Sequence, residues 1–308
     1  MERRVPSHDE VLSYLRDRAN WGRWGPDDEM GALNLVTPEK RVSAARLVRS
    51  GRAVTLSRYF PKTPGIGNPH PAQHYMQVIE RELGDGGGAL DYYGVFYHGR
   101  TVTHMDALCH VWGSEGMWNG RDPKVEVGYE GARFGGIDKW AEGLMTRGVL
   151  LDIPGLRGEP YVTQDKPVHG WDLEDAARAQ GITVEPGDAV AVYCGREKWQ
   201  EAHPEDVYGT VDPKTKPGLH ASCLPFLRDN DVSVLAWDMM DLQPEGYRIS
   251  LPVHAAIFAY GVALLDNCLL QGLSEACREE GRYEFMLTVA PLRVAGGTGS
   301  PANPIATF

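Results

Sequence analysis

Two histidines and one aspartate stand close together in the chain, in an H-x-D-x-x-x-H pattern formed by His104, Asp106 and His110. Residues two apart on an extended segment point to the same face, so His104 and Asp106 are expected side by side. His110 follows four residues later, which leaves room for a turn that brings its ring back. Two imidazoles and a carboxylate directed at one point suit zinc or a similar divalent ion. The competing interpretation is coincidence, because the chain has ten histidines.

A second candidate cluster pairs His254 with Asp266, twelve residues further along. We expect His254 in the first turn of a helix that begins at Pro252, and Asp266 at the end of an apolar strand. Asp266 could complete or bridge a metal site. Taken alone, the pair is better explained as a surface histidine and a helix cap.

Other chemistries find little support in the sequence. It contains no G-x-S-x-G motif for a serine nucleophile. Cys109 neighbours His110, but adjacent residues do not face each other on a helix or strand, so Cys109 is expected to be a small buried residue. The glycine-rich residues 296–301 precede no helix that could bind phosphate, so we expect a turn there.

The composition limits the partners and the location. The chain has 308 residues, a net charge of −11 and no basic cluster, so nucleic acid is not an expected partner, and the acidic charge argues against binding to anionic membranes. Five cysteines without a C-x-x-C pair argue against a disulfide framework and favour the cytoplasm. No apolar segment resembles a secretory signal or a membrane span.

The elements that must position these residues alternate between strands and helices. Pro and Gly are spread throughout, which favours one domain over 1–308, with an N-terminal arm at 1–36. Thr37 and Pro38 mark the start of a helix that Gly51 closes. A mixed α/β core is predicted from strands at 147–153, 189–194, 232–237, 263–265 and 283–294 and helices at 173–180, 221–228 and 270–280.

Two irregular segments are candidates to border a binding site. Residues 112–138 are polar and Gly-rich, which is typical of an active-site loop. Trp112 begins that segment, and Trp24 follows Trp21 in the N-terminal arm. Trp24 and Trp112 are therefore candidate substrate contacts, although tryptophans in an arm more often pack it against the body. Strands are expected at 74–82 and 91–97, the second leading towards His104.

The segment from Thr103 to His110 resembles the signature of the cyclase family, H-x-G-T-H-x-D-x-x-x-H, whose members include kynurenine formamidases and isatin hydrolases. Further likeness extends over most of the chain, at residues 147–152, 187–188, 217–219, 254, 266 and 297–301. The resemblance implies a swivelling β/β/α fold with mixed central β-structure and flanking helices. It also implies metal-dependent hydrolysis of an amide, either a formamide or a cyclic amide.

The same resemblance implies roles for individual residues. His104 and Asp106 would bind metal, and His254 and Asp266 would contribute to a second metal position. His110 would donate and accept protons. Phe60 falls near the place of a substrate-contacting aromatic residue in the formamidases.

The sequence departs from the signature at three positions. Arg100 stands in place of the first histidine, Val102 in place of the glycine, and Asp266 in place of a glutamate. Arg100 would remove one ligand and repel a second cation, so a single zinc or manganese ion is expected rather than two. Arg100 is then a candidate catalytic residue that pairs with a substrate carboxylate or a developing oxyanion.

The resemblance thus implies a metal-dependent hydrolase of a small-molecule amide, and it suggests a homodimer or homotetramer. One alternative is a metal-dependent lyase or cyclase in a catabolic or secondary-metabolite pathway. The other is a non-catalytic small-molecule binding protein that has lost its metal site at Arg100.

Overall fold

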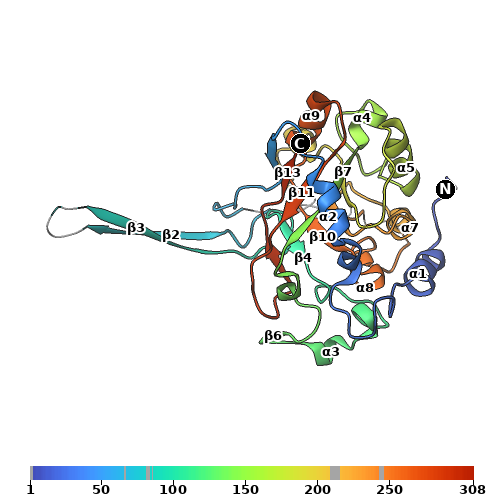
Figure 1. Cartoon of the computed structure of the whole chain (residues 1–308), viewed down its shortest axis with the longest axis horizontal. Helices are drawn as coiled ribbons and strands as arrows, with labels where there is room; N and C mark the ends of the chain where they lie inside the picture. The colour runs from blue at the N-terminus through green and yellow to red at the C-terminus, as the bar shows by residue number, and fades with distance from the viewer. Residues whose placement is uncertain (1–2, 66, 81–83, 85, 209–215, 243–245) are drawn as a thin grey trace.

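A nine-stranded, curled mixed sheet forms the body of the protein in the computed structural model, which describes all residues except 1–2, 66, 81–83, 85, 209–215 and 243–245 (Figure 1). The four central strands run parallel to one another, and every other neighbouring pair is antiparallel. In spatial order the strands are β1 (Ala53–Thr55), β13 (Ile305–Thr307), β11 (Glu284–Val289), β7 (Leu144–Asp152), β8 (Ala189–Tyr193), β9 (Val234–Trp237), β10 (Ala263–Asp266), β4 (His104–Asp106) and β12 (Gly299–Pro301).

The parallel strands form the core of the body. Every residue of β8, β9 and β10 is buried, which explains why their sequences are continuous apolar runs. The predicted mixed α/β architecture is confirmed. The strand expected at 283–294 as the last of the chain is β11, which ends at Val289, two residues before Pro291, which lacks the N–H that a sheet requires. Two further strands, β12 and β13, follow it.

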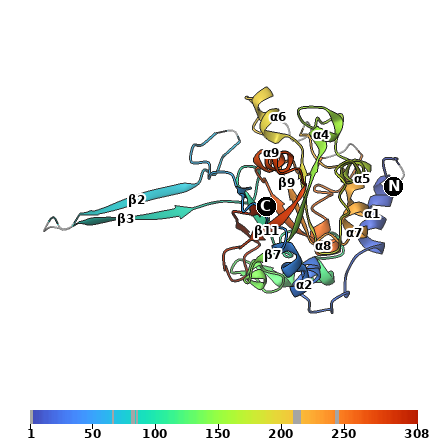
Figure 2. The same ribbon diagram turned by 45° about the horizontal axis from the view of Figure 1, so that its top comes forward.

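Helices flank the sheet, as Figures 1 and 2 show. α2 packs against β7 and β11, while α9 contacts β1 and β7. The predicted start of α2 is confirmed, because Pro38 is its first residue and the Thr37 hydroxyl accepts a hydrogen bond from Lys40 N. No helix in the described part of the chain is long and apolar enough to cross a membrane. The helices are α1 (His8–Asp17), α2 (Pro38–Ala45), α3 (Pro123–Glu126), α4 (Ile153–Arg157), α5 (Gly170–Ala179), α6 (Arg196–Ala202), α7 (Leu224–Asp229), α8 (Ala256–Tyr260) and α9 (Gln271–Glu280).

The helix expected from Pro252 begins later than predicted. α8 starts at Ala256, and His254 lies in the turn before it. Asp241 accounts for the difference, because its Oδ1 accepts hydrogen bonds from the backbone N–H groups of Val253 at 2.5 Å and His254 at 3.2 Å. These bonds fix an irregular turn that presents the His254 ring.

A two-stranded hairpin projects from the body (Figures 1 and 2). It consists of β2 (Gln73–Glu80) and β3 (Gly87–Gly94) in antiparallel register. The second strand was expected at 91–97, but it starts four residues earlier and ends at Gly94, so the glycines at 87 and 88 belong to the strand. The end of the first expected strand, residues 81–82, lies outside the described residues.

Candidate metal centre and adjoining cavity

The register between β4 and β10 brings His104 and Asp266 together. These two residues are Cα partners on neighbouring antiparallel strands, and Asp106 lies two residues along on the same face as His104. His104 Nε2 is 3.3 Å from Asp106 Oδ1 and 3.9 Å from Asp266 Oδ2. His104 Nδ1 donates to the carbonyl of Val102 at 2.8 Å, which directs Nε2 towards the carboxylates.

His98 joins this group, although the pattern of the sequence did not single it out. Its Nδ1 lies 3.1 Å from Asp106 Oδ1, and its ring stacks on that of His110 with centroids 3.9 Å apart. His98 Nε2 contacts the Thr298 hydroxyl at 2.9 Å, so the terminal glycine-rich segment orients the ring. Gly299 provides space for it, because a Cβ there would lie 3.1 Å from His98 Cε1 and 2.5 Å from the Met105 carbonyl.

A turn of five residues connects His98 to His104 and corrects the interpretation of Arg100. The Gly99 φ of +144° lies in the region that favours glycine, and Asn267 donates to the carbonyls of both Gly99 and Val102. The Arg100 carbonyl accepts a hydrogen bond from Arg196. The longer turn brings the His98 imidazole to the carboxylates, where the signature would place the ring of residue 100. The expectation of a single ion stays a prediction.

His254 approaches the same carboxylates from the other side. Its Nε2 is 3.1 Å from Asp266 Oδ2 and 3.8 Å from Asp106 Oδ2, while its Nδ1 is hydrogen-bonded to Asp241. Asp266 is itself held by Trp237, whose Nε1 donates to Oδ1 at 2.5 Å. The shorter side chain of Asp266, compared with glutamate, still reaches the cluster.

The Asp106 carboxylate is the centre of this arrangement and has unsatisfied oxygens. Its side chain is fully buried, and neither oxygen has a hydrogen-bond partner; His98 Nδ1 has none either. Four imidazoles surround it, with His98 and His104 nearest to Oδ1 and His110 and His254 nearest to Oδ2. A buried charge without hydrogen bonds is costly unless a cation compensates it. The donor set of imidazoles and carboxylates fits a divalent metal.

Two overlapping sets of residues lie close enough to hold an ion. One is His98, Asp106 and His110, and the other is His104, Asp106 and Asp266. Asp106 belongs to both, so its two oxygens can serve two neighbouring positions. All four residues predicted as metal ligands are thus brought together, along with His110.

The electrostatics of the cluster reflect concentrated negative charge. Burial would lower the pKa of His104, but Asp106 and Asp266 outweigh it and raise that pKa to about 8. Burial also opposes the rise for His254, whose pKa is nevertheless held well above its usual value by Asp241 and Asp266. His110 differs, because burial lowers its pKa to about 4 and leaves it neutral at pH 7. A bound metal would replace the protons that these carboxylates otherwise hold on imidazole.

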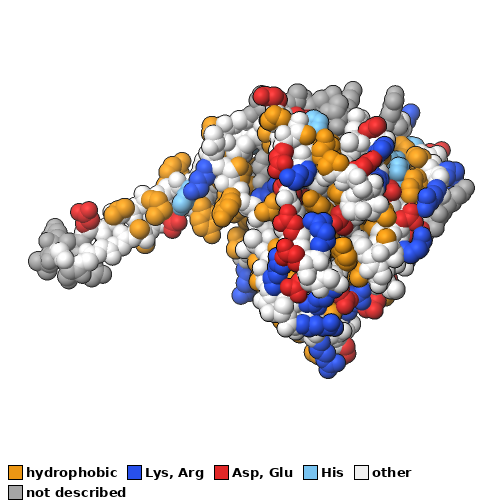
Figure 3. Space-filling view, turned by 90° about the horizontal axis from the view of Figure 1, so that it is seen from above, with side chains coloured by type: hydrophobic (Ala, Val, Ile, Leu, Met, Phe, Trp, Pro, Cys, Tyr) orange, Lys and Arg blue, Asp and Glu red, His pale blue; other side chains and the backbone are white. Residues whose placement is uncertain are grey.

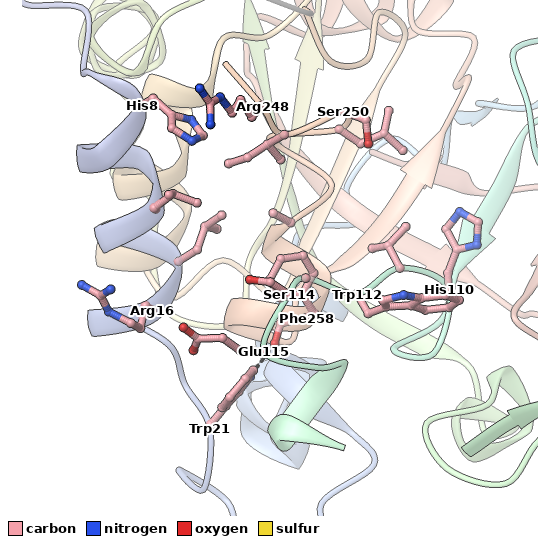
Figure 4. Close-up of a pocket in the computed structure, with 17 residues that line it drawn as sticks. His8, Arg16, Trp21, His110, Trp112, Ser114, Glu115, Arg248, Ser250 and Phe258 are labelled. Atoms are coloured by element: carbon pink, nitrogen blue, oxygen red, sulfur yellow. Dashed lines mark hydrogen bonds between the residues drawn. The ribbon is translucent and has the colours of Figure 1, made fainter. Parts of the chain in front are cut away.

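A cavity of about 630 Å³ opens beside His110 (Figure 4). Figure 4 shows His110 and Trp112 at one end and α1, with His8 and Arg16, at the other. Its walls are mainly apolar, and the Trp21 indole is fixed there by a hydrogen bond to the Phe258 carbonyl at 2.6 Å. The apolar lining consists of Leu12, Leu15, Trp21, Val111, Trp112, Ile249, Leu251, Ala255 and Phe258.

The predicted substrate contacts lie in different places. Trp112 lines the cavity and is half exposed, whereas Trp24 packs on Trp118 with ring centroids 6.1 Å apart. Phe60 lies at the root of the hairpin, 6.2 Å from Tyr93, and does not line the cavity. From the segment 112–138, only residues 112–115 reach the cavity. Cys109 is buried, which raises the pKa of its thiol to about 12 and makes it a poor nucleophile.

Comparison with known proteins assigns this chain to a family. The Cyclase family model matches residues 52–244, which is more than half of the chain, so the protein belongs to the cyclase family. The chain is 28% identical over 93 residues to the kynurenine formamidase of Bacillus cereus (strain ATCC 10987 / NRS 248). That match covers 30% of this chain and 41% of the relative, less than half of its length.

Solved structures share the fold over nearly the whole chain. The crystal structure of a novel cyclase has a TM-score of 0.83 and 28% identity, covering 94% of this chain and 99% of that one. Isatin hydrolase A from Labrenzia aggregata, bound to benzyl benzoate, has a TM-score of 0.57 and 20% identity, covering 87% and 97%. Isatin hydrolase A from Ralstonia solanacearum has a TM-score of 0.56 and 16% identity, covering 88% and 97%. The isatin hydrolases therefore establish likeness of fold.

Two residues of the candidate metal centre were not predicted from the sequence. His98 precedes His104 by six residues, whereas the first histidine of the signature precedes the second by four. The presence of a nearby histidine could have indicated a ligand, but its spacing did not match the signature. Asp241 lies thirteen residues before His254 and follows no recognisable motif. Its role depends on the tertiary turn that it stabilises.

Proposed function

We propose that this protein is a metal-dependent hydrolase that cleaves the C–N bond of a small-molecule amide. The observation that carries the proposal is the Asp106 carboxylate, fully buried, without hydrogen bonds and surrounded by four imidazoles. Zinc or manganese ions are the expected cofactors, because both accept this mixture of nitrogen and oxygen ligands.

We assign ligands by the oxygen of Asp106 that each residue approaches. His98 and His104 lie nearest to Oδ1, whereas His254 lies nearer to Oδ2 and contacts Asp266. Asp106, His98 and His104 would hold one ion, and Asp106, His254 and Asp266 would hold a second. Asp241 would keep the His254 ring oriented and basic, as carboxylates do for metal-bound histidines.

His110 is the residue best placed to move protons. When bound, the metal would polarise the amide carbonyl and lower the pKa of water from about 16 towards 7. His110 is neutral at pH 7 and lines the cavity, so its ring can accept a proton from the attacking water and pass it to the leaving nitrogen. The water oxygen joins the carbonyl carbon, and the C–N bond breaks as nitrogen takes the proton.

The cavity supports a substrate with an aromatic or apolar body. Its volume of about 630 Å³ is ample for such a molecule, and Trp112 and Phe258 offer aromatic surfaces beside His110. The names of the relatives, a kynurenine formamidase and isatin hydrolases, favour a formamide or a cyclic amide. A contact between Arg100 and a substrate anion stays a prediction.

The test is a screen of formanilide, isatin and a cyclic imide with zinc or manganese in ¹⁸O-labelled water. Hydrolysis places the label in the product acid and stops when the metal is chelated. A lyase or cyclase would form product without the label, and a binding protein would form none. Full activity of the metal-free protein would contradict the proposal.

A further inference from the structure

The cavity beside His110 has a second polar end, on the far side from the metal centre. His8 and Arg248 line it there, opposite Trp112 and His110 (Figure 4). The two residues come from distant parts of the chain, the start of α1 and the irregular segment before α8. Mainly apolar side chains border the space between the two ends. A ligand that fills the cavity would therefore meet polar groups at both ends and apolar surface between them.

Tyr247 joins the two segments that form this far end. Its hydroxyl donates a hydrogen bond to the Pro6 carbonyl, and its ring centroid lies 6.2 Å from that of His8. α1 is also fixed to α8, because the Tyr260 hydroxyl donates to the Tyr14 carbonyl at 3.1 Å. The side of the cavity that carries His8 is thus a built wall of the body.

Arg248 brings a positive charge to the cavity without a counterion. Basic and acidic side chains are interspersed over the face of the body that Figure 3 shows. Among the residues that the structure describes, however, no carboxylate pairs with Arg248 and no acceptor takes a hydrogen bond from it. Its guanidinium is therefore available to a ligand in the cavity.

His8 adds a polar group that lacks a partner. Its Nδ1 is buried and has no hydrogen-bond partner in the described part of the chain. A buried polar atom without a hydrogen bond is costly unless a ligand or water satisfies it. An imidazole carries at least one N–H in either protonation state, so His8 can donate to a ligand beside Arg248.

The other charged groups of the cavity wall offset each other. Asp17, 2.7 Å away, and to a lesser degree Glu115 raise the pKa of Arg16. Figure 4 shows Arg16 and Glu115 on the same side of the cavity, towards Trp21. The uncompensated positive charge of the cavity wall therefore lies at Arg248.

We infer that Arg248, together with His8, binds a carboxylate at the end of the substrate remote from the scissile amide. The inference rests on the proposed amide hydrolysis and narrows its substrate class to amides with an apolar body and a distal acid group. One arginine balances one negative charge, and its planar guanidinium binds a carboxylate through two parallel N–H groups. This subsite is separate from Arg100, which does not line the cavity.

A series of formanilides tests the inference. Each carries a para-carboxyalkyl chain, in increasing length, and is compared with the carboxamide of the same length. In the metal-loaded wild type, kcat/KM for the best acid should exceed that of its carboxamide by about 10–100-fold, the typical effect of a hydrogen bond to a charged group. The preference should peak at one chain length, because the structure fixes the separation between the two ends of the cavity.

Variants assign the preference to named residues. Arg248→Gln removes the charge and should abolish the preference for the acid, while His8→Phe keeps a ring without N–H groups and should reduce it several-fold. Arg49→Gln is the matched control, because Arg49 is exposed outside the cavity and its loss should leave the preference intact. No preference in the wild type at any length, or an undiminished preference in Arg248→Gln, would overturn the inference.

Binding of the products separates this inference from the proposed function. Calorimetry should show that the wild type binds a para-aminophenylalkanoate more tightly than its carboxamide, and that Arg248→Gln does not. Arg248-dependent binding without turnover of any amide would support the carboxylate subsite and contradict the proposed hydrolysis. Turnover of acids and carboxamides at equal rates would support the hydrolysis and contradict the subsite.

Discussion

His98 Nδ1 lies 3.1 Å from Asp106 Oδ1, although the two residues are eight apart in the sequence and belong to different elements. This contact changes the expected metal centre. It provides the imidazole that the family signature places two residues later, where this chain has Arg100. Asp106 then has histidines near both of its oxygens, and a two-ion centre becomes the better proposal.

Replacing His98 with alanine should remove one of two metal equivalents. Loss of even an indirect supporting partner typically costs 10–100-fold, so loss of a ligand should lower kcat/KM by more than about 100-fold. Metal content after dialysis and steady-state kinetics would measure both effects. His70→Ala is the control, because His70 is exposed near the hairpin root and outside the cluster. Unchanged metal content in His98→Ala would exclude His98 as a ligand.

Replacing Gly299 with alanine should displace His98 without replacing any of the proposed ligands. The new Cβ would lie 2.5 Å from the Met105 carbonyl, which is too close for any real contact, so β12 or His98 must shift. We expect metal affinity to fall by about 10–100-fold. Gly272→Ala, whose Cβ meets only Val54 at 3.8 Å, should keep full affinity and gain roughly 0.5–1 kcal/mol of stability in α9. Calorimetric metal titration would compare the two.

Replacing Asp241 with asparagine should weaken the second ion position. The amide keeps an oxygen for the Val253 and His254 N–H groups but removes the negative charge beside His254 Nδ1. We expect a fall of about 10–100-fold in metal affinity. The metal-free protein should also lose thermal stability, because the buried His254 ring loses one of the two carboxylates that stabilise its protonated form. Wild-type affinity in this variant would show that His254 does not depend on Asp241.

His220 should make folding stability sensitive to mild acid. It is buried away from the metal centre, and burial, together with nearby His169, lowers its pKa to about 4. Because the unfolded pKa is near 6.5, the unfolded chain binds the proton first as the pH falls. The stabilisation that comes from neutral His220 is therefore complete above about pH 6.5 and is lost as the pH falls towards about 4. At pH 5 the loss in free energy of unfolding should be roughly 1–2 kcal/mol.

Urea unfolding at pH 7 and pH 5 would measure this effect. His220→Asn is the informative variant, because His220 Nδ1 accepts a hydrogen bond from Ser222 N and asparagine can replace that cap. The variant should lose less stability than the wild type between the two pH values. An equal loss in both proteins would rule out His220 as the source.

Most of the core, and the grouping of His104 with Asp106, could be predicted from the sequence because both depend on local patterns. The apolar runs of β7 to β10 and the Thr37–Pro38 helix start are encoded by neighbouring residues. His104 and Asp106 could be placed on one face because strand periodicity is local. That Asp266 lies opposite His104 depends on the register between two strands about 160 residues apart, and only the resemblance to the family suggested it.

The features of the fold and site that could not be predicted from the sequence depend on contacts between residues far apart in the chain. The length of the turn after His98 is stabilised by Asn267 and Arg196, far along the chain. The short α8 follows from the two hydrogen bonds that Asp241 accepts. The β2–β3 hairpin has the alternating sequence that is typical of strands, but this alternation does not indicate that the strands project from the body.

Metal content of wild type and Asp106→Asn, measured beside activity, tests the central claim most directly. Asparagine has nearly the same shape and can still fill the buried site, but it lacks the charge that both proposed ion positions share. The account predicts about two equivalents of zinc or manganese in the wild type, fewer than one in Asp106→Asn, and loss of hydrolysis in the variant and in chelated wild type. A variant that retains full metal content, or a wild type that hydrolyses its substrate without metal, would contradict it.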